Sequence, residues 1–260
     1  MNVNLTGEQW SYVYNILSFG LISMLATTVF TLVSQHRVLP KYRNALVLSS
    51  MVTFIAGYHY LRIFDSFKDA TVEGSFDVMV DFNADPNAFN EAYRYVDWIL
   101  TVPLLLVEVI AVLALAKEAS KSLITRLVPA SAAMIALGYP GEINSDPGTK
   151  VIWGVLSTIP FLYILYVLFV ELGKSLDRQP EGVAATVGRL RLLLIATWGV
   201  YPISYMMPLF ADNAMTDPNS FMWRQIGYTV ADVLAKCLFG LTIFKIARMK
   251  SMAEGMKDDH

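Results

Sequence analysis

The sequence predicts an all-α membrane protein, a bundle of seven transmembrane helices. The chain has 260 residues and is 55% hydrophobic but only 16% charged, whereas a soluble domain is about 45–50% apolar and about 25% charged. Apolar segments recur along the chain, each near or above the roughly 20 residues that cross a bilayer as a helix. The predicted spans are 9–34, 44–66, 91–116, 122–140, 151–173, 188–210 and 222–247.

These spans are expected to be helices because only helices and closed barrels satisfy backbone polar groups in lipid, and the segments show no strand-like alternation. Seven spans leave short connections, which predicts one domain over residues 1–260. The second connection is longer, and its segment 69–85, DATVEGSFDVMVDFNAD, predicts a short hairpin on the outer face of the bundle.

Basic residues predict the orientation, because cytoplasmic connections carry an excess of Lys and Arg. The first, third and fifth connections and the C-terminal tail are basic, whereas the second is acidic. We therefore expect a multi-pass protein of the cell membrane with the N-terminus outside and the C-terminus in the cytoplasm. The net charge of −2 does not indicate a nucleic-acid partner, and no metal site is predicted.

Charge inside a membrane span is costly and indicates function, and five ionisable residues stand out in the predicted spans. Arg94, Asp97 and Glu108 are in the third span, and Asp232 and Lys236 are in the seventh. Burial disfavours the charged ammonium of Lys236, which makes it a nucleophilic amine suited to forming a Schiff base. Asp232 lies one helical turn earlier on the same face. The spacing alone is equally compatible with a buried ion pair that fixes helix packing.

The third span, RYVDWILTVPLLLVE, favours the functional interpretation. Arg94 and Asp97 share a helix face, and Thr101 lies one turn beyond Asp97. Glu108 follows Asp97 by eleven residues, which returns it to within about 20° of the same face and about 16 Å along the axis. Two carboxylates at different depths, with Lys236 available between them, form the layout of a proton relay.

The motif R-Y-x-D-W-x-x-T-x-P-L-L from Arg94 and the motif D-x-x-x-K from Asp232 resemble the core motifs of the microbial (type 1) rhodopsins. The resemblance covers all seven spans, and two further segments belong to it: W-x-x-Y-P from Trp198, and STIPFLYILYVLF from Ser157. It implies that Lys236 carries all-trans retinal as a protonated Schiff base. It also implies roles for Asp97 as proton acceptor, Asp232 as second counterion, Glu108 as cytoplasmic proton donor and Arg94 as gate on the release side.

The resemblance further implies a retinal pocket of aromatic and small residues. Taken singly, each of these residues would more often belong to the ordinary core than to a binding pocket. Leu105 matches a position that tunes colour, and leucine there accompanies green absorption. The implied pocket residues are Trp98, Leu105, Met134, Gly138, Ser157, Trp198, Tyr201, Pro202 and Tyr205.

Within this family the chain resembles the proteorhodopsin and xanthorhodopsin proton pumps, which share the acids at Asp97 and Glu108 and the threonine at Thr101. His59 matches a histidine that pairs with the acceptor carboxylate in that subfamily. Gly154 matches a glycine that opens a window to a carotenoid antenna in xanthorhodopsin-like members. The alternative for Gly154 is that it only permits close helix packing.

The expected function is therefore light-driven outward proton pumping by a transporter and not an enzyme. The alternatives are a photosensory rhodopsin that signals to a partner, a light-gated channel, and a seven-helix receptor without retinal. The resemblance implies a cyclic homo-oligomer in lipid. No residue can be assigned as the outer proton-release group; the acids available there are Glu142, Asp146, Asp212 and Asp217.

Overall fold

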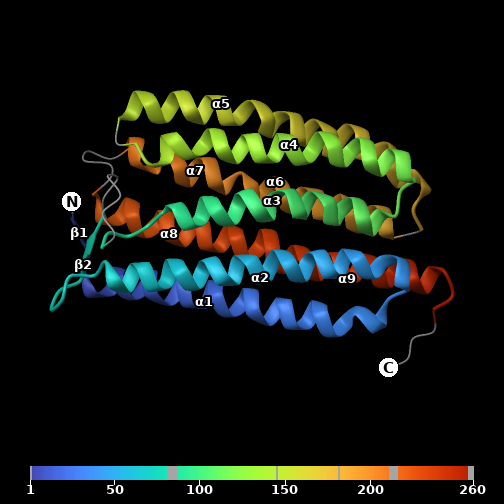
Figure 1. Cartoon of the computed structure of the whole chain (residues 1–260), viewed down its shortest axis with the longest axis horizontal. Coiled ribbons are helices and arrows are strands. Elements are labelled where there is room, and N and C mark those ends of the chain that lie inside the picture. The colour runs from blue at the N-terminus through green and yellow to red at the C-terminus, as the bar shows by residue number, and fades with distance from the viewer. Residues whose placement is uncertain (1, 81–86, 145, 181, 211–215, 257–260) are drawn as a thin grey trace.

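The computed structural model describes residues 2–80, 87–144, 146–180, 182–210 and 216–256. Its helices run side by side along the long axis of the molecule (Figure 1). The N-terminus and two short strands lie at one end, and the C-terminus lies at the other. We name these the outer end and the inner end, following the orientation predicted from the basic residues, which stays a prediction.

The seven-helix prediction is confirmed. Six helical segments are long and apolar enough to cross a membrane, and three abutting segments form the seventh. The main helices are α1 (Gly7–Val33), α2 (Pro40–Asp69), α3 (Ala92–Leu113), α4 (Lys117–Glu142), α5 (Pro147–Tyr166), α6 (Val183–Trp198), α7 (Val200–Met206), α8 (Pro218–Asp232) and α9 (Phe239–Ala253). Shorter turns join or extend them: η1 (Ser34–Arg37), η2 (Val167–Glu171), η3 (Leu172–Arg178), η4 (Met207–Phe210) and η5 (Val233–Leu238).

Several helices begin earlier than the apolar runs predict. Proline opens α2, α5 and α8, where its missing N–H costs no hydrogen bond. The side chains of Thr6, Asp146 and Asp217 accept backbone hydrogen bonds from the first turns of α1, α5 and α8. These polar first turns were omitted from the predicted spans because only the apolar residues were counted.

The fifth, sixth and seventh paths are not uniform α-helices, which the sequence did not predict. The fifth path passes into a π-helical turn, η2, and then a 3₁₀ turn, η3. The sixth divides at Gly199 into α6 and α7. The seventh contains a second π-helical turn, η5, which includes Lys236. π-Helical turns are rare in proteins overall, and those that occur are often found at functional sites.

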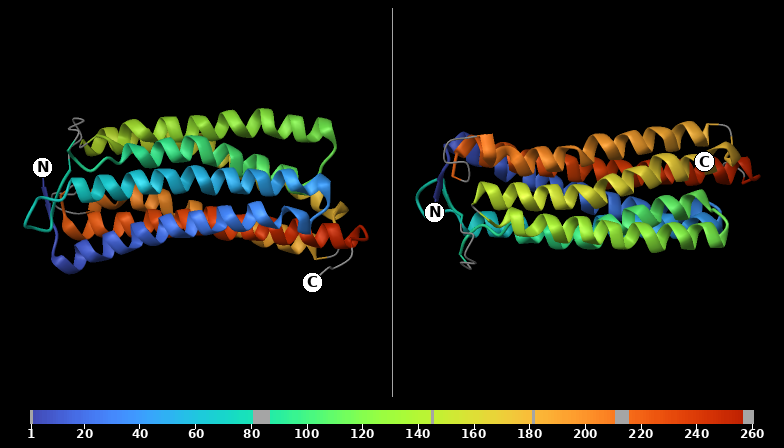
Figure 2. Two further views of the ribbon diagram at one scale, coloured as in Figure 1. Left: turned by 60° about the horizontal axis from the view of Figure 1, so that its bottom comes forward. Right: turned by 90° about the horizontal axis from the view of Figure 1, so that it is seen from above.

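The central position of α3 brings its polar residues into the protein interior. It packs against α2, α4 and α9, and the views in Figure 2 place it among the other helices. More than half of its apolar stretch is buried, whereas less than a fifth of the corresponding stretch of the fifth path is buried. A charged residue on α3 is therefore removed from lipid and must find its partners on neighbouring helices.

A small sheet covers part of the outer end. β1 (Asn2–Asn4) pairs antiparallel with β2 (Asp77–Met79), and Val78 also pairs with Thr71. The second connection thus folds back on itself at Thr71 and Val78, as the predicted hairpin requires, but the main partner of β2 is the N-terminal strand. Part of the predicted hairpin, residues 81–85, lies outside the described residues.

Gly20 permits close contact between α1, α2 and α8. A Cβ atom there would lie 2.5 Å from Tyr60 Cε1 and 2.9 Å from Thr229 Cγ2. The Tyr60 hydroxyl also donates a hydrogen bond to Asp232 (2.8 Å), so its ring cannot move freely. We expect Gly20→Ala to lower the free energy of unfolding by about 1–3 kcal/mol, measured by thermal unfolding followed by circular dichroism.

The matched control is Gly188→Ala on α6, because a Cβ atom at Gly188 meets nothing within 4 Å. It should leave the unfolding temperature unchanged or raise it slightly, since alanine favours helix more than glycine does. Equal effects of the two substitutions would contradict the packing role of Gly20.

Candidate functional site: a buried lysine between two carboxylates

The side chain of Lys236 lies in the interior with two acids beside it. Its Nζ forms ion pairs with Oδ1 of Asp232, one turn earlier, and with Oδ2 of Asp97 on α3 at 3.1 Å. All three side chains are essentially inaccessible to solvent. A buried ammonium is tolerated only with such partners, and two acids can neutralise more charge than one lysine supplies.

Asp232 is held by donors from four helical paths. Its Oδ1 accepts hydrogen bonds from Trp98 Nε1 (3.1 Å) and the Tyr201 hydroxyl (2.8 Å), in addition to the contact with Lys236. Its Oδ2 accepts a hydrogen bond from the Tyr60 hydroxyl at 2.8 Å. Hydrogen bonds to the charged form of a carboxylate stabilise that form, so this arrangement favours an Asp232 that stays ionised.

Arg94 joins this centre to the outer end. Its Nη1 lies 3.9 Å from Asp232 Oδ2 and 3.4 Å from the Tyr60 hydroxyl. Its Nη2 donates to Gln225 Oε1 at 2.7 Å, and its Nε lies 3.8 Å from Glu91 Oε2. The guanidinium group therefore bridges the carboxylate beside Lys236 and a carboxylate nearer the outer end, a position consistent with the predicted gate.

Asp97 has fewer partners than Asp232. Neither carboxylate oxygen accepts a hydrogen bond, apart from the ion pair with Lys236. The Thr101 hydroxyl donates to the backbone carbonyl of Asp97 (2.9 Å) and not to its side chain. His59 lies within electrostatic range of Asp97, but its Nδ1 bonds the Ile55 carbonyl (2.9 Å). No hydrogen bond joins His59 to Asp97 in this structure, so their pairing stays a prediction.

Glu108 is separate from this centre and lies nearer the inner end of α3. It is completely buried, and within the part of the chain that the structure describes neither of its carboxylate oxygens accepts a hydrogen bond. The nearby hydroxyl of Ser49 on α2 is also unpaired. An ionised carboxylate without partners is strongly disfavoured in such surroundings, so the environment favours a neutral Glu108 that holds a proton.

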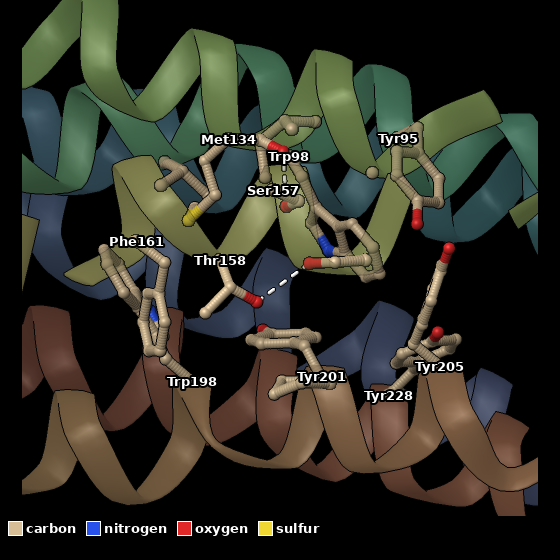
Figure 3. Close-up of a pocket in the computed structure, with 15 residues that line it drawn as sticks. Tyr95, Trp98, Met134, Ser157, Thr158, Phe161, Trp198, Tyr201, Tyr205 and Tyr228 are labelled. Carbon is tan, nitrogen blue, oxygen red and sulfur yellow. Dashed lines mark hydrogen bonds between the residues drawn. The ribbon is translucent and has the colours of Figure 1, made fainter. Parts of the chain in front are cut away.

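A largely apolar cavity adjoins the Lys236 centre. Figure 3 shows side chains of α3, α4 and α5 facing those of α6, α7 and α8 across it. It leaves about 750 Å³ that protein atoms do not fill, part of it continuous with the protein surface. Every predicted pocket residue lines it except Leu105, which is buried elsewhere in the core, and Gly154 lines it as well. Residues that the sequence did not predict complete the lining: Tyr95, Val102, Ile135, Thr158, Phe161 and Tyr228.

The cavity and the lysine fit a covalently bound polyene aldehyde. Trp98 and Tyr201 line the cavity and also donate to Asp232, so one end of the cavity borders the Lys236 centre. Trp98 packs edge-on against Tyr201, and Phe161 lies 6.4 Å from Trp198 between ring centroids. Flat aromatic walls suit a conjugated chain.

Comparison with known proteins decides the family. A family model described as bacteriorhodopsin-like protein matches residues 13–249. The chain belongs to this family. The chain is 32% identical to the green-light absorbing proteorhodopsin of Gamma-proteobacterium EBAC31A08. The alignment covers 92% of this chain and 88% of that relative. The predicted resemblance to microbial rhodopsins is confirmed.

Solved structures agree with this assignment. The bacteriorhodopsin-like chain superimposes on thermophilic rhodopsin with a TM-score of 0.91 and 43% identity, covering 98% of this chain and 100% of that one. Against xanthorhodopsin, described as a light-driven ion pump with dual chromophore, the TM-score is 0.88 and the identity 44%, with 99% of each chain covered. The family and the six long apolar helices make this a multi-pass protein of the cell membrane.

Several site residues of this bacteriorhodopsin-like protein were missed at the sequence level. Tyr60 and Gln225 are fully buried and bind Asp232 and Arg94. Glu91 and Arg224 form an ion pair at 2.7 Å between α8 and the residue preceding α3. The only signal in the sequence was that these polar residues stand at or inside apolar spans. Their partners lie on distant segments of the chain, so the sequence did not show which residues would pair.

The structure distinguishes between the acids considered for proton release. Asp146 and Asp217 cap α5 and α8 through bonds to Thr149 N and Ser220 N, both 2.7 Å. Hydrogen bonds from the Thr149 side chain and backbone lower the pKa of Asp146, which disfavours it as a proton carrier near neutral pH. Glu142 is buried at the outer end of α4, whereas Asp212 lies outside the described residues.

Proposed function

We propose that this bacteriorhodopsin-like protein is a light-driven outward proton pump, with all-trans retinal bound to Nζ of Lys236 as a protonated Schiff base. The observation that carries the proposal is the arrangement of Lys236 Nζ beside Asp97 and Asp232, at the border of an aromatic cavity. A second buried acid, Glu108, stands on the same helix as Asp97 but nearer the inner end. The related proteorhodopsin and the light-driven ion pump xanthorhodopsin support the same function.

Bound retinal would absorb visible light and, by isomerising, change the proton affinity and the direction of the N–H at Lys236. Each of three acidic side chains then has a separate role in moving the proton. Asp97 Oδ2, at 3.1 Å from Nζ and without a hydrogen-bond donor, receives the proton. Asp232 remains ionised because four side-chain donors hold it. Glu108, neutral in its unpartnered environment, returns a proton to Nζ.

The direction of proton transport follows from the positions of Asp97 and Glu108 along α3. Glu108 is eleven residues beyond Asp97, about 16 Å nearer the inner end. A proton accepted on the outer side and replaced from the inner side makes one net transfer outward. With the predicted orientation, light therefore exports protons from the cytoplasm.

The deciding experiment measures the pH of an unbuffered suspension of cells that express the chain with added all-trans retinal. We expect acidification in the light that a protonophore abolishes. Cells expressing Lys236→Ala should be colourless and inactive. A light response that the protonophore enhances would contradict proton pumping, because it indicates passive proton flow driven by another ion. Coloured cells without any pH change would favour the sensory alternative.

We further propose that Gly154 forms a window through which a carotenoid antenna contacts the retinal cavity. Gly154 lines that cavity, part of which is continuous with the protein surface. Xanthorhodopsin, with its dual chromophore, supports the proposal. Gly154→Trp should abolish carotenoid-sensitised excitation of retinal, because a Cβ atom already approaches Tyr205 Cε1 to 3.2 Å. The measurement is the excitation spectrum for pumping after addition of zeaxanthin.

The control for this variant is its own retinal absorption band, which should persist while the carotenoid contribution disappears. Sensitisation that survives in Gly154→Trp would exclude the window. A cyclic homo-oligomer, which the resemblance implies, stays a prediction that native mass spectrometry can check.

A further inference from the structure

Two acids at the outer end share one arginine. Arg224 of α8 donates from Nη2 to Glu91 Oε1 at 2.7 Å, and its Nη1 lies 3.7 Å from Glu142 Oε1. The side chains of Arg224 and Glu142 are 3% and 2% exposed, and that of Glu91 is 12% exposed. Such a buried group of charges is costly to maintain, and the proton relay described above uses none of the three.

Glu91 is connected inward to the Lys236 centre, and Glu142 is connected inward to the lining of the retinal cavity. Gln225 Nε2 donates to Glu91 Oε1 at 2.8 Å, and its Oε1 accepts from Arg94 Nη2 at 2.7 Å. Arg94 in turn contacts Asp232. Glu142 Oε2 is instead close to the hydroxyls of Tyr95 (3.3 Å) and Tyr228 (3.5 Å), both of which line the retinal cavity.

Both acids are also connected outward. Glu91, Glu142 and Arg224 line a polar cavity at the outer end, together with Arg62 and Asp65. One oxygen of each acid has no hydrogen-bond partner: Oε2 of Glu91 and Oε1 of Glu142. Among the described residues, each has only a long ion pair, Glu91 Oε2 with Arg94 Nε at 3.8 Å and Glu142 Oε1 with Arg224 Nη1 at 3.7 Å, and each is a position at which a proton can be taken up.

Charge balance indicates the resting state of this pair. Among the described residues of the outer half, four basic side chains are buried: Arg94, Lys150, Arg224 and Lys236. Four acids face them as buried or nearly buried groups: Glu91, Asp97, Glu142 and Asp232. The charges balance only when Glu91 and Glu142 are both ionised, and unbalanced buried charge is unfavourable. The resting pair therefore holds no proton to give and can accept one.

We propose that Glu91 and Glu142, bridged by Arg224, form the exit relay that takes the proton from Asp97 and passes it to the outer cavity. This inference rests on the proposed pump function. One proton leaves the Asp97 carboxyl, occupies a carboxylate oxygen of the pair, and leaves for water in the cavity, so no redox partner is needed. The groups that bear on its transfer are Arg94, Arg224, Lys150, Tyr95, Tyr205 and Tyr228.

The relay predicts that outward release follows the loss of the proton from Asp97. The test is flash excitation of retinal-loaded protein, with an impermeant pH dye for release and time-resolved infrared detection of the Asp97 carboxylic acid C=O band. Glu91→Gln, Glu142→Gln and the double variant should each slow both signals about tenfold or more, with the largest effect in the double variant. Glu142→Asp should restore most of the rate, because it keeps a carboxylate.

Asp65→Asn is the matched control, because Asp65 lines the same cavity but forms its ion pair with exposed Lys68 at 3.3 Å and not with Arg224. It should leave both signals unchanged. Release at wild-type speed in Glu91→Gln and in Glu142→Gln, or wild-type release that precedes proton loss from Asp97, would overturn the relay. Either result leaves the pump intact if continuous light still acidifies the medium, whereas failure of the wild-type protein to acidify it would refute the pump itself.

Discussion

Replacing Asp97 with Asn is expected to abolish light-driven acidification and to shift the visible absorption band to longer wavelength. The Asp97 carboxylate lies 3.1 Å from Lys236 Nζ, and an amide there can neither accept the proton nor balance the positive charge. Light excitation moves positive charge away from Nζ along the polyene, so a carboxylate beside Nζ stabilises the ground state more than the excited state. Its removal lowers the excitation energy. Absorption spectroscopy and the pH of illuminated cells measure both effects.

The control for this substitution is Asp97→Glu, which keeps an acid at the same position and should retain the band and part of the transport. Acidifying the wild-type protein until Asp97 binds a proton should reproduce the red shift of Asp97→Asn, because both changes neutralise the same group. Transport by Asp97→Asn at the wild-type rate would refute the acceptor assignment, and an unshifted band would refute the close contact with Nζ.

The spacing along single helices was sufficient to predict the centre of the site. Asp232 and Lys236 are four residues apart, and in the structure they form an ion pair. The repeat of the α-helix also placed Asp97 and Glu108 on one face of α3, and both are buried. Within a helix the backbone geometry fixes which side chains share a face, so these relations can be read from the sequence.

Contacts between helices could not be predicted in the same way. The sequence did not show that the hydroxyl of Tyr60 reaches Asp232, which is 172 residues away. The same holds for Arg224 and Glu91, 133 residues apart. Which interior faces meet depends on the tilt and rotation of every helix in the bundle, and packing of the complete set of side chains determines these angles.

The periodicity of the sequence also could not predict the π-helical turn at Lys236. η5 spans Val233–Leu238, and a π turn shifts the following residues relative to an uninterrupted α-helix. The apolar run from Val233 onward is compatible with either geometry. The Asp232–Lys236 pair forms in this irregular segment, so spacing found the partners but did not reveal the local geometry that positions them.

Glu108→Gln is expected to slow the return of the proton to Lys236 Nζ by about 10²–10⁴-fold, the usual contribution of a positioned proton donor. Glu108 is completely buried without hydrogen-bond partners, so the wild-type residue favours the neutral acid that this step requires. Glutamine has nearly the same shape but no acidic proton. The absorption band should hardly move, because Glu108 lies about 16 Å from Asp97 along α3. Flash photolysis measures the recovery of the resting pigment.

Glu118→Gln is the matched control for this donor, since Glu118 is an exposed acid in the first turn of α4, at the same end of the bundle. It should leave recovery unchanged. A rise in recovery time with increasing external pH in Glu108→Gln, steeper than in the wild-type protein, would show that protons then arrive directly from the medium. Recovery at the wild-type rate in Glu108→Gln would refute the donor assignment, and the buried acid would then have to be explained by helix packing alone.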